Sequence, residues 1–152
     1  MGEKAPAFDM PTDGDGNVSL ASLAGNNVVL YFYPKDDTSG CTKEAGDFRD
    51  SVREFRKVNG TVIGVSRDTV ASHDKFKKKH DLPFVLASDA DGKASGAYGT
   101  WVEKSMYGRK YMGMERATFL IDGNGVIRAI WRKVKVPGHV DEVLKAAKGL
   151  PA

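Results

Sequence analysis

The strongest constraint on the fold is an uninterrupted apolar and aromatic run at residues 28–33, which ends at Pro34. Strands that are buried on both faces of a parallel sheet have this composition, because helices cover both faces. Proline ends such a run because it has no N–H to donate to a neighbouring strand. The run therefore predicts a central strand in a sheet that is covered by helices.

Helix-like segments and further apolar runs alternate after this strand. In the first helix-like segment, apolar residues recur at spacings of three and four until Asn59-Gly60 provides a stop. An Asp-Gly-Asn-Gly turn at 122–125 predicts a hairpin, because Asn-Gly supplies the positive φ that tight turns require. Residues 99–115 show no clear pattern. The other predicted strands are residues 61–66, 84–87, 117–121 and 126–131, and the predicted helices are residues 41–58, 72–80, 93–98 and 140–147.

The order of these elements limits the fold class. Alternating strands and helices give parallel strands, and the late hairpin adds an antiparallel pair. Phe8 and Met10, the turn-rich residues 13–17, and then Val18 and Leu20 predict a β-hairpin at the start. An α/β thioredoxin-like fold, with a mixed central sheet flanked by helices, has this order, as do other small α/β domains. At 152 residues we expect one domain, residues 1–152.

Composition and charge exclude several classes. The chain has 41% hydrophobic residues, enough for an ordinary core, and a net charge of +3 is too small to indicate a nucleic-acid partner. The basic residues 75–80 are interpreted as a solvated helix face with Phe76 packed inward. No run reaches the roughly 18 apolar residues of a membrane span, and the N-terminus lacks a signal-peptide pattern. We therefore expect a soluble, cytoplasmic protein without a membrane partner.

Histidine and cysteine usage bears on metal and redox chemistry. The three histidines, His73, His80 and His139, are scattered without the spacing of a helical zinc site, so no metal is predicted. Cys41 is the sole cysteine, which excludes an intrachain disulfide or a multi-cysteine metal site. It lies where the central strand has ended and a helix begins, and the unpaired N–H groups and helix dipole there favour a thiolate. Position alone nevertheless favours an inert buried thiol, because free cysteines usually behave as small buried hydrophobic residues.

The neighbours of Cys41 carry groups that suit a reactive thiol. The hydroxyl of Thr38 can fold over the helix N-terminus, donate to a thiolate and contact a substrate. Glu44 lies three residues after Cys41 on the same side of the helix, where it can orient a cation or stabilise the helix start. Asp36 and Asp37 would oppose a thiolate if they pointed inward, so both are interpreted as solvated loop charges.

A resemblance to a known family covers nearly the whole chain. Residues 34–41, Pro-Lys-Asp-Asp-Thr-Ser-Gly-Cys, resemble the active-site loop of peroxiredoxins, which has Pro, three residues, Thr or Ser, two residues and Cys. The strings VVLYFYPKDDTSGCTKEAGDFRD, GVSRD, MYGR and ERATFLID are similar to the bacterioferritin-comigratory (BCP) or PrxQ subfamily. The resemblance implies a thiol-dependent peroxidase that reduces hydrogen peroxide and organic hydroperoxides through a cysteine sulfenic acid, without a metal or organic cofactor.

The resemblance also assigns roles to individual residues. It makes Cys41 the nucleophile, with Thr38 as a hydrogen-bonding partner of the peroxide and Pro34 as a shield of the site. The backbone N–H groups of Gly40 and Cys41 would stabilise charge on the leaving oxygen.

Two further roles concern residues that the pattern alone would leave unassigned. The arginine of the family matches Arg116, which would stabilise the thiolate and hold the peroxide oxygens. Glu44 matches the acidic residue that orients this arginine. Without the resemblance, Arg116 is an ordinary cation at a strand end.

One departure from the family affects the catalytic cycle. Many relatives carry a resolving cysteine five residues after the first, where this chain has Gly46, and others carry it in the next helix, where this chain has Lys77. With neither present, the resemblance implies a one-cysteine enzyme that an external thiol recycles. Thioredoxin, glutathione with glutaredoxin, or another small thiol are the alternatives, and the resemblance permits a monomer or a weak homodimer.

Two other function classes remain as alternatives at this point. A thiol transferase is disfavoured because the Cys-x-x-Cys pair is absent. A binding or chaperone module would keep the fold without turnover, and replacement of Thr38 or Arg116 would then have little effect. The aromatic residues Trp101, Tyr107 and Tyr111 either line the substrate entrance or pack in the core.

Overall fold

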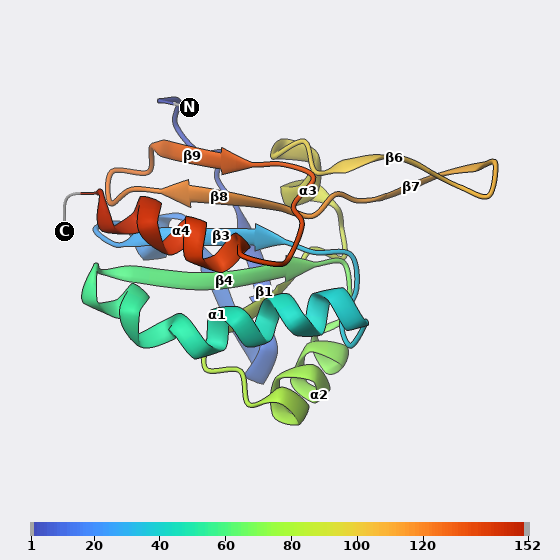
Figure 1. Ribbon diagram of the computed structural model, residues 1–152, viewed down its shortest axis with the longest axis horizontal. Helices are drawn as coiled ribbons and strands as arrows, with labels where there is room; N and C mark the ends of the chain where they lie inside the picture. Colours follow the sequence, from blue (N-terminus) through green and yellow to red (C-terminus); the bar gives the residue numbers. More distant parts are fainter. Residues whose placement is uncertain (1, 151–152) are drawn as a thin grey trace.

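The computed structural model describes residues 2–150 and contains a seven-stranded mixed sheet in the order β2-β1-β5-β4-β3-β8-β9 (Figure 1). Residues 1, 151 and 152 of the predicted domain lie outside the described part. The strands are β1 (Asp9–Thr12), β2 (Gly16–Ser19), β3 (Asn27–Phe32), β4 (Gly60–Ser66), β5 (Val85–Ser88), β8 (Ala117–Ile121) and β9 (Ile127–Trp131). The helices are α1 (Ser39–Lys57), α2 (Val70–His80), α3 (Lys93–Ala97) and α4 (His139–Lys148).

The predicted central strand is confirmed as β3, whose six residues are all buried. It pairs in parallel with β4 and antiparallel with β8, and β4 pairs in parallel with β5. The sheet is therefore mixed, as the order of elements predicts, and the thioredoxin-like fold class is confirmed. None of the helices between residues 2 and 150 is long and apolar enough to cross a membrane.

The two faces of the sheet bury separate cores, because successive side chains of a strand point to opposite sides. On one face, α1, α2 and α4 pack over the sheet, and Tyr31 of β3 stacks on Phe48 of α1 with ring centroids 4.6 Å apart. On the other face, the N-terminal segment and α3 cover Phe32, which contacts Tyr98. Each fully buried aromatic or aliphatic side chain contributes roughly 1.5–3 kcal/mol.

The predicted N-terminal hairpin is present and forms one edge of the sheet. Its strands β1 and β2 pair antiparallel, and a short 3-10 turn at Asp13–Asp15 joins them. On its other side β1 meets β5 only at Thr12 and Ala87. The hairpin therefore extends the sheet beyond the parallel strands.

The unassigned residues 99–115 form a second, separate hairpin of β6 (Trp101–Met106) and β7 (Arg109–Met114). It projects away from the body of the protein (Figure 1). Its tight turn has Tyr107 and Gly108 at φ 52° and 78°, as both central residues of such a turn require. Because most of its side chains are exposed, the hairpin lacks the alternation of apolar and polar residues that predicts a half-buried strand.

Candidate active site

Cys41 lies in the first turn of α1 with its side chain only 2% exposed. The Thr42 N–H donates to the Thr38 carbonyl over 2.8 Å, which closes the first helical turn. The N–H groups of Ser39, Gly40 and Cys41 precede this bond and have no acceptor within the helix. They give the helix start a partial positive charge beside the Cys41 sulfur.

Arg116 and Glu44 converge on this sulfur from two elements. Arg116 directly precedes β8, and its Nη2 lies 3.3 Å from the Cys41 Sγ. Its Nη1 donates to the Glu44 Oε1 over 2.7 Å, and Glu44 sits on α1 one turn after Cys41. The structure thus brings together three residues that are up to 75 positions apart in sequence.

Burial and mutual charge set the pKa values of the Glu44 and Arg116 pair. The Glu44 side chain is fully buried, which raises its pKa to about 7 even though the Arg116 charge acts in the opposite direction. Burial by itself would lower the pKa of Arg116, but Glu44 and Cys41 raise it above its usual value. The guanidinium therefore stays charged next to the sulfur.

Gly40 provides the space that the guanidinium occupies. A Cβ atom at this position would lie 3.2 Å from the Arg116 Nη2, closer than most such contacts. The absence of a side chain lets Arg116 approach the first turn of α1 and contact Cys41.

The two remaining loop residues are both exposed. The Thr38 hydroxyl donates to the Lys35 carbonyl over 2.9 Å rather than to Cys41, so the expected hydrogen bond to the sulfur is not present in this structure. Its oxygen still has lone pairs that can accept a hydrogen bond. Pro34 is exposed and directly follows Tyr33, the last residue that continues the line of β3.

The interpretation of Asp36 as a solvated charge is wrong. Its side chain is buried and accepts hydrogen bonds from the Tyr33 hydroxyl, from the Ser72 hydroxyl over 2.8 Å and from His73. Its N–H donates to the Asp68 carboxylate over 2.8 Å. A buried carboxylate is stable when several donors satisfy it, and here they come from α2 and the end of β3. The active-site loop is thereby attached to α2.

Asp37 is exposed, as predicted. Its carboxylate forms ion pairs with Lys79, over 2.9 Å, and with His80, over 3.2 Å. The basic end of α2 therefore lies beside the loop that leads to Cys41, and Phe76 packs inward as the sequence indicates.

His73 is the buried histidine of this network. Its Nδ1 lies 2.7 Å from the Asp36 carboxylate, and its Nε2 lies 2.9 Å from the Ala87 carbonyl. Both neighbours accept hydrogen bonds, so both ring nitrogens donate, as in an imidazolium. Burial alone would lower the pKa of His73, but the hydrogen bond and charge of Asp36 and the Ala87 carbonyl raise it above its usual value.

Sequence reasoning missed Asp36, His73 and Asp68 as residues that support the site. Asp68 lies within the string GVSRD, which carries the family resemblance but suggests no role by itself. The contacts of these three residues span more than 30 positions, so no local spacing predicts them.

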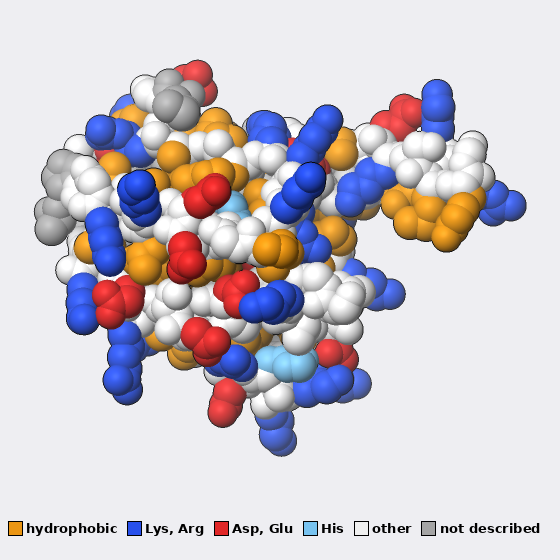
Figure 2. Space-filling model, viewed as in Figure 1, with side chains coloured by type: hydrophobic (Ala, Val, Ile, Leu, Met, Phe, Trp, Pro, Cys, Tyr) orange, Lys and Arg blue, Asp and Glu red, His pale blue; other side chains and the backbone are white. Residues whose placement is uncertain are grey.

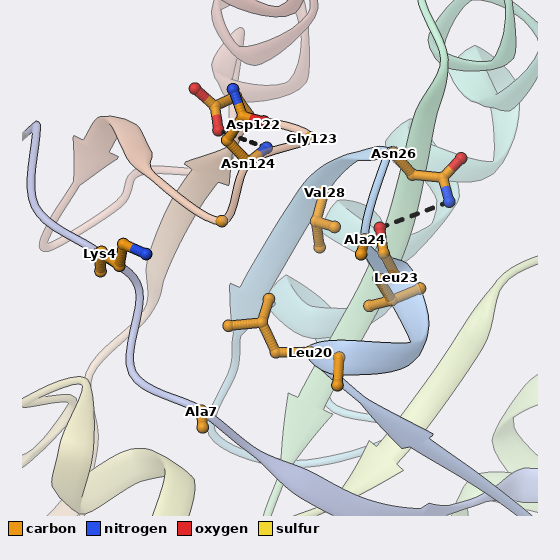
Figure 3. A pocket seen from close by; sticks show the side chains of 12 residues that line it. Lys4, Ala7, Leu20, Leu23, Ala24, Asn26, Val28, Asp122, Gly123 and Asn124 are labelled. Atoms are coloured by element: carbon orange, nitrogen blue, oxygen red, sulfur yellow. Dashed lines mark hydrogen bonds between the residues drawn. The ribbon is translucent and has the colours of Figure 1, made fainter.

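A pocket of about 480 Å³ lies at the end of β3 opposite to the site (Figure 3). Leu20, Leu23 and Val28 give it an apolar lining, and the loop with Gly123 forms another wall. The pocket and Cys41 lie at opposite ends of β3, so the pocket is not part of the candidate active site. Among the residues that the structure describes, no group of three His, Cys, Asp or Glu side chains is placed to hold a metal ion.

Comparisons with known proteins identify the family. The AhpC/TSA family model matches residues 1–130. The chain belongs to the AhpC/TSA family. A putative peroxiredoxin Bcp of Coxiella burnetii is 54% identical over 144 residues, 95% of each chain. The peroxiredoxin Bcp of Bacillus subtilis is 47% identical over 99% of this chain and 96% of its own. This peroxiredoxin therefore lies in the Bcp and PrxQ branch, as the resemblance implies.

Solved structures agree with this placement. The bacterioferritin comigratory protein of Xanthomonas campestris, studied for alkyl peroxide reduction, has a TM-score of 0.89 and 44% identity, covering 93% of this chain and 90% of that one. Thiol-dependent peroxide reduction through a cysteine sulfenic acid is accordingly the activity of this peroxiredoxin. The thiol-transferase and binding-module alternatives are not supported.

Proposed function

We propose that Cys41 is the nucleophile of this peroxidase, and that it reduces hydrogen peroxide and organic hydroperoxides. The observation that carries the proposal is the 3.3 Å contact between the Arg116 guanidinium and the Cys41 sulfur at the start of α1. The alkyl peroxide reduction studied in the Xanthomonas campestris relative supports the inclusion of organic hydroperoxides.

The reaction begins when the Cys41 thiolate attacks one peroxide oxygen in line with the O–O bond. The S–O bond forms as the O–O bond breaks, and the leaving oxygen takes up a proton to depart as water or alcohol. Cys41 becomes a sulfenic acid. No metal or organic cofactor takes part in this sequence.

The surrounding groups act on the charge that develops during this step. Arg116 and the N–H groups of Gly40 and Cys41 stabilise negative charge on the thiolate and on the leaving oxygen. The Thr38 oxygen accepts a hydrogen bond from the peroxide hydroxyl and so aligns it. Glu44 orients Arg116 through their 2.7 Å contact.

Pro34 has a steric role in this proposal. It is exposed at the start of the loop and shields the site from bulk water.

An external thiol completes the cycle, because this chain has one cysteine. Solved variants of the Xanthomonas campestris peroxiredoxin Q replace one of two cysteines that are 36 positions apart in that chain. The same separation from Cys41 leads to Lys77, whose amino group binds Asp13 over 2.6 Å. Thioredoxin, glutaredoxin with glutathione, or another small thiol supplies the reducing equivalents.

The remaining features of the proposal concern the working form of the protein. Residues 1–152 act as one domain, as a monomer or weak homodimer, without a nucleic-acid or membrane partner. A reducing compartment supplies the external thiol, so the cytoplasm is the proposed location.

Single-turnover oxidation tests the function. Reduced protein is mixed with hydrogen peroxide without reductant, and Trp101 or Trp131 fluorescence reports the oxidation. We expect one equivalent of peroxide to be consumed orders of magnitude faster than by free cysteine, with a sulfenic acid trapped at Cys41. The Arg116→Ala variant should lose most of this acceleration, whereas Arg128→Ala, an exposed cation on β9, serves as the control. A rate equal to that of free cysteine would contradict the proposal.

A further inference from the structure

The β6–β7 hairpin carries an unusual surface. Between residues 2 and 150, the exposed large hydrophobic side chains all lie on it, namely Met106, Tyr107, Tyr111 and Met112, with exposed fractions from 44% to 97%. Figure 2 shows hydrophobic side chains gathered along one side of the projecting arm, with Lys and Arg side chains at its tip. A clustered apolar surface of this kind marks an interaction site.

Strand register shows which side chains of the hairpin share a face. Lys104 pairs directly with Tyr111, and Met106 pairs with Arg109, so these four side chains share one face of the hairpin. The Glu103 and Met112 pair lies on the other face. We call Met106, Tyr107 and Tyr111 the hairpin patch.

Lys104 lies on the same face of the hairpin as Met106 and Tyr111. Its side chain lies over Gly113, where a Cβ atom would be 3.1 Å from the Lys104 Cδ. Burial and the charge of Arg116 lower the pKa of Lys104, and the charge of Cys41 opposes this. The strand β7 ends at Met114, two residues before Arg116, so the base of this hairpin lies next to the Arg116 and Cys41 contact.

The base of the hairpin is fixed, so the patch is held at a set distance from the thiol. The Arg67 guanidinium stacks on the Trp101 ring with 3.3 Å to its centroid, and the Glu115 N–H donates to the Thr100 carbonyl over 2.7 Å. The arm beyond this base is six residues long on each strand, or roughly 20 Å.

The length of the hairpin indicates how large a molecule must be to contact both the hairpin patch and Cys41. A peroxide at the Cys41 sulfur, or a small thiol such as glutathione, is too short to contact both the sulfur and the tip of an arm of roughly 20 Å. A protein of domain size can contact the whole patch while its own thiol reaches Cys41. The hairpin carries Lys104, Arg109 and Lys110 against one carboxylate, Glu103, so its charge complements a partner with acidic residues around an apolar surface.

We propose that the hairpin patch docks a small dithiol protein with an apolar, acid-flanked surface around its reactive thiol, and that this protein reduces oxidised Cys41. The inference rests on the proposed one-cysteine cycle. The first partner thiol attacks the sulfenic sulfur, forms a mixed disulfide and releases water. The second partner thiol attacks the partner sulfur of this disulfide, which returns Cys41 as a thiol and leaves the partner with an internal disulfide.

Separate half-reactions test the proposal. The variant Met106→Ser/Tyr107→Ser/Tyr111→Ser removes the patch, and Met112→Ser is the matched control on the opposite face of the same hairpin. Stopped-flow fluorescence measures oxidation of each protein by hydrogen peroxide and by cumene hydroperoxide. It then measures reduction of the sulfenic form by dithiothreitol, thioredoxin and glutaredoxin.

We take the protein reductant that reduces the wild type faster. With this reductant, we expect the rate of reduction of the triple variant to fall by about tenfold or more, because exposed aromatic anchors dominate protein docking. Both oxidation rates and the dithiothreitol step should stay within about twofold of the wild type, which also shows that the site is folded. Arg109→Glu should weaken the salt dependence of the protein-reductant step.

Several outcomes would overturn the docking proposal. One is an unchanged rate of reduction by the protein reductant in the triple variant, and another is an equal loss of this rate in Met112→Ser. A third is a selective loss of the rate of oxidation by cumene hydroperoxide, which would mean that the patch binds the peroxide substrate. A dimer that dissociates in the triple variant would instead assign the patch to a second copy of the chain. Slow oxidation of the wild type by hydrogen peroxide would refute the peroxidase function itself, which is a separate result.

Discussion

The Asp36 carboxylate lies 2.7 Å from the His73 Nδ1 in a pair that is almost fully shielded from solvent. Asp36 belongs to the loop that leads to Cys41, and His73 belongs to α2. The pair therefore fixes the active-site loop against a helix that begins 29 positions after Cys41.

Replacement of Asp36 tests this attachment. Asp36→Asn leaves the His73 imidazolium without its counter-charge, and loss of one partner of a buried pair costs about 3–5 kcal/mol. We expect urea unfolding to report a loss of this order, together with slower oxidation of Cys41 by peroxide in a single turnover. Asp37→Asn, which removes an exposed ion pair, should cost only about 0–1 kcal/mol. Similar losses in both variants would show that the Asp36 pair has no special role.

Two buried histidines predict opposite dependences of stability on pH. The pKa of His73 is raised above the usual 6.5, so its stabilising contribution is complete below pH 6.5 and is lost as pH rises through its folded-state pKa. Burial and the nearby Arg116 charge lower the pKa of His139 to about 4, so its folded form loses stability as pH falls from 6.5 toward 4.

Unfolding free energies measured from pH 4 to pH 9 separate the two contributions. The difference between the wild type and His73→Gln should shrink as pH rises above 6.5. The difference between the wild type and His139→Gln should change mainly below pH 6.5. Parallel pH profiles for both variants and the wild type would refute the assigned protonation states.

Gly40→Ala is expected to lower activity without lowering stability. The added methyl would lie 3.2 Å from the Arg116 Nη2 and displace the guanidinium from the sulfur by a few tenths of an ångström. We expect about a tenfold slower single turnover, since small misplacements of catalytic groups have large kinetic effects. Alanine also favours a helix by about 1 kcal/mol over glycine, so urea unfolding should report equal or higher stability.

Gly46→Ala is the matched control on the same helix. A Cβ atom there would lie 3.6 Å from the Arg49 Nη2, an ordinary contact that leaves Arg116 in place. If both variants react with peroxide as fast as the wild type, Gly40 has no part in placing Arg116.

A second cysteine at position 77 should change how the sulfenic acid is resolved. Lys77→Cys places a thiol 36 positions after Cys41, the separation found in the Xanthomonas campestris relative. After one equivalent of peroxide we expect a Cys41–position 77 disulfide, detected as loss of both free thiols and by mass spectrometry. Lys77→Ser loses the same Asp13 ion pair and should retain a trappable sulfenic acid. Persistence of sulfenic acid in Lys77→Cys would contradict the expectation.

The sequence predicts elements whose pattern is regular and whose contacts are local. The buried run of β3, the amphipathic α1 and the Asn-Gly turn before β9 each predict their own structure. The resemblance named Arg116 and Glu44 in advance, although no spacing rule connects them with Cys41. Their convergence depends on the antiparallel pairing of β8 with β3, which sets Ala117 opposite Phe32 and so brings Arg116 to the end of β3, near the start of α1.

The errors have physical causes that single-sequence reasoning does not capture. Asp36 looks like an exposed loop charge because its donors, Ser72 and His73, come from a helix far along the chain. The β6–β7 hairpin follows no amphipathic pattern because it has no core face, and Tyr107 is nearly fully exposed instead of packed.

The presence of a single cysteine makes two reactions compete at every turnover. In the proposed cycle Cys41 becomes a sulfenic acid, and the same sulfur then reacts either with the reductant or with a second peroxide, which gives a sulfinic acid. No thiol within the chain can intervene, so the outcome depends on the ratio of peroxide to reductant in the surroundings. The fraction of active enzyme therefore depends on the oxidant load: peroxide is reduced while reductant is plentiful, and individual molecules are inactivated by further oxidation when reductant runs short.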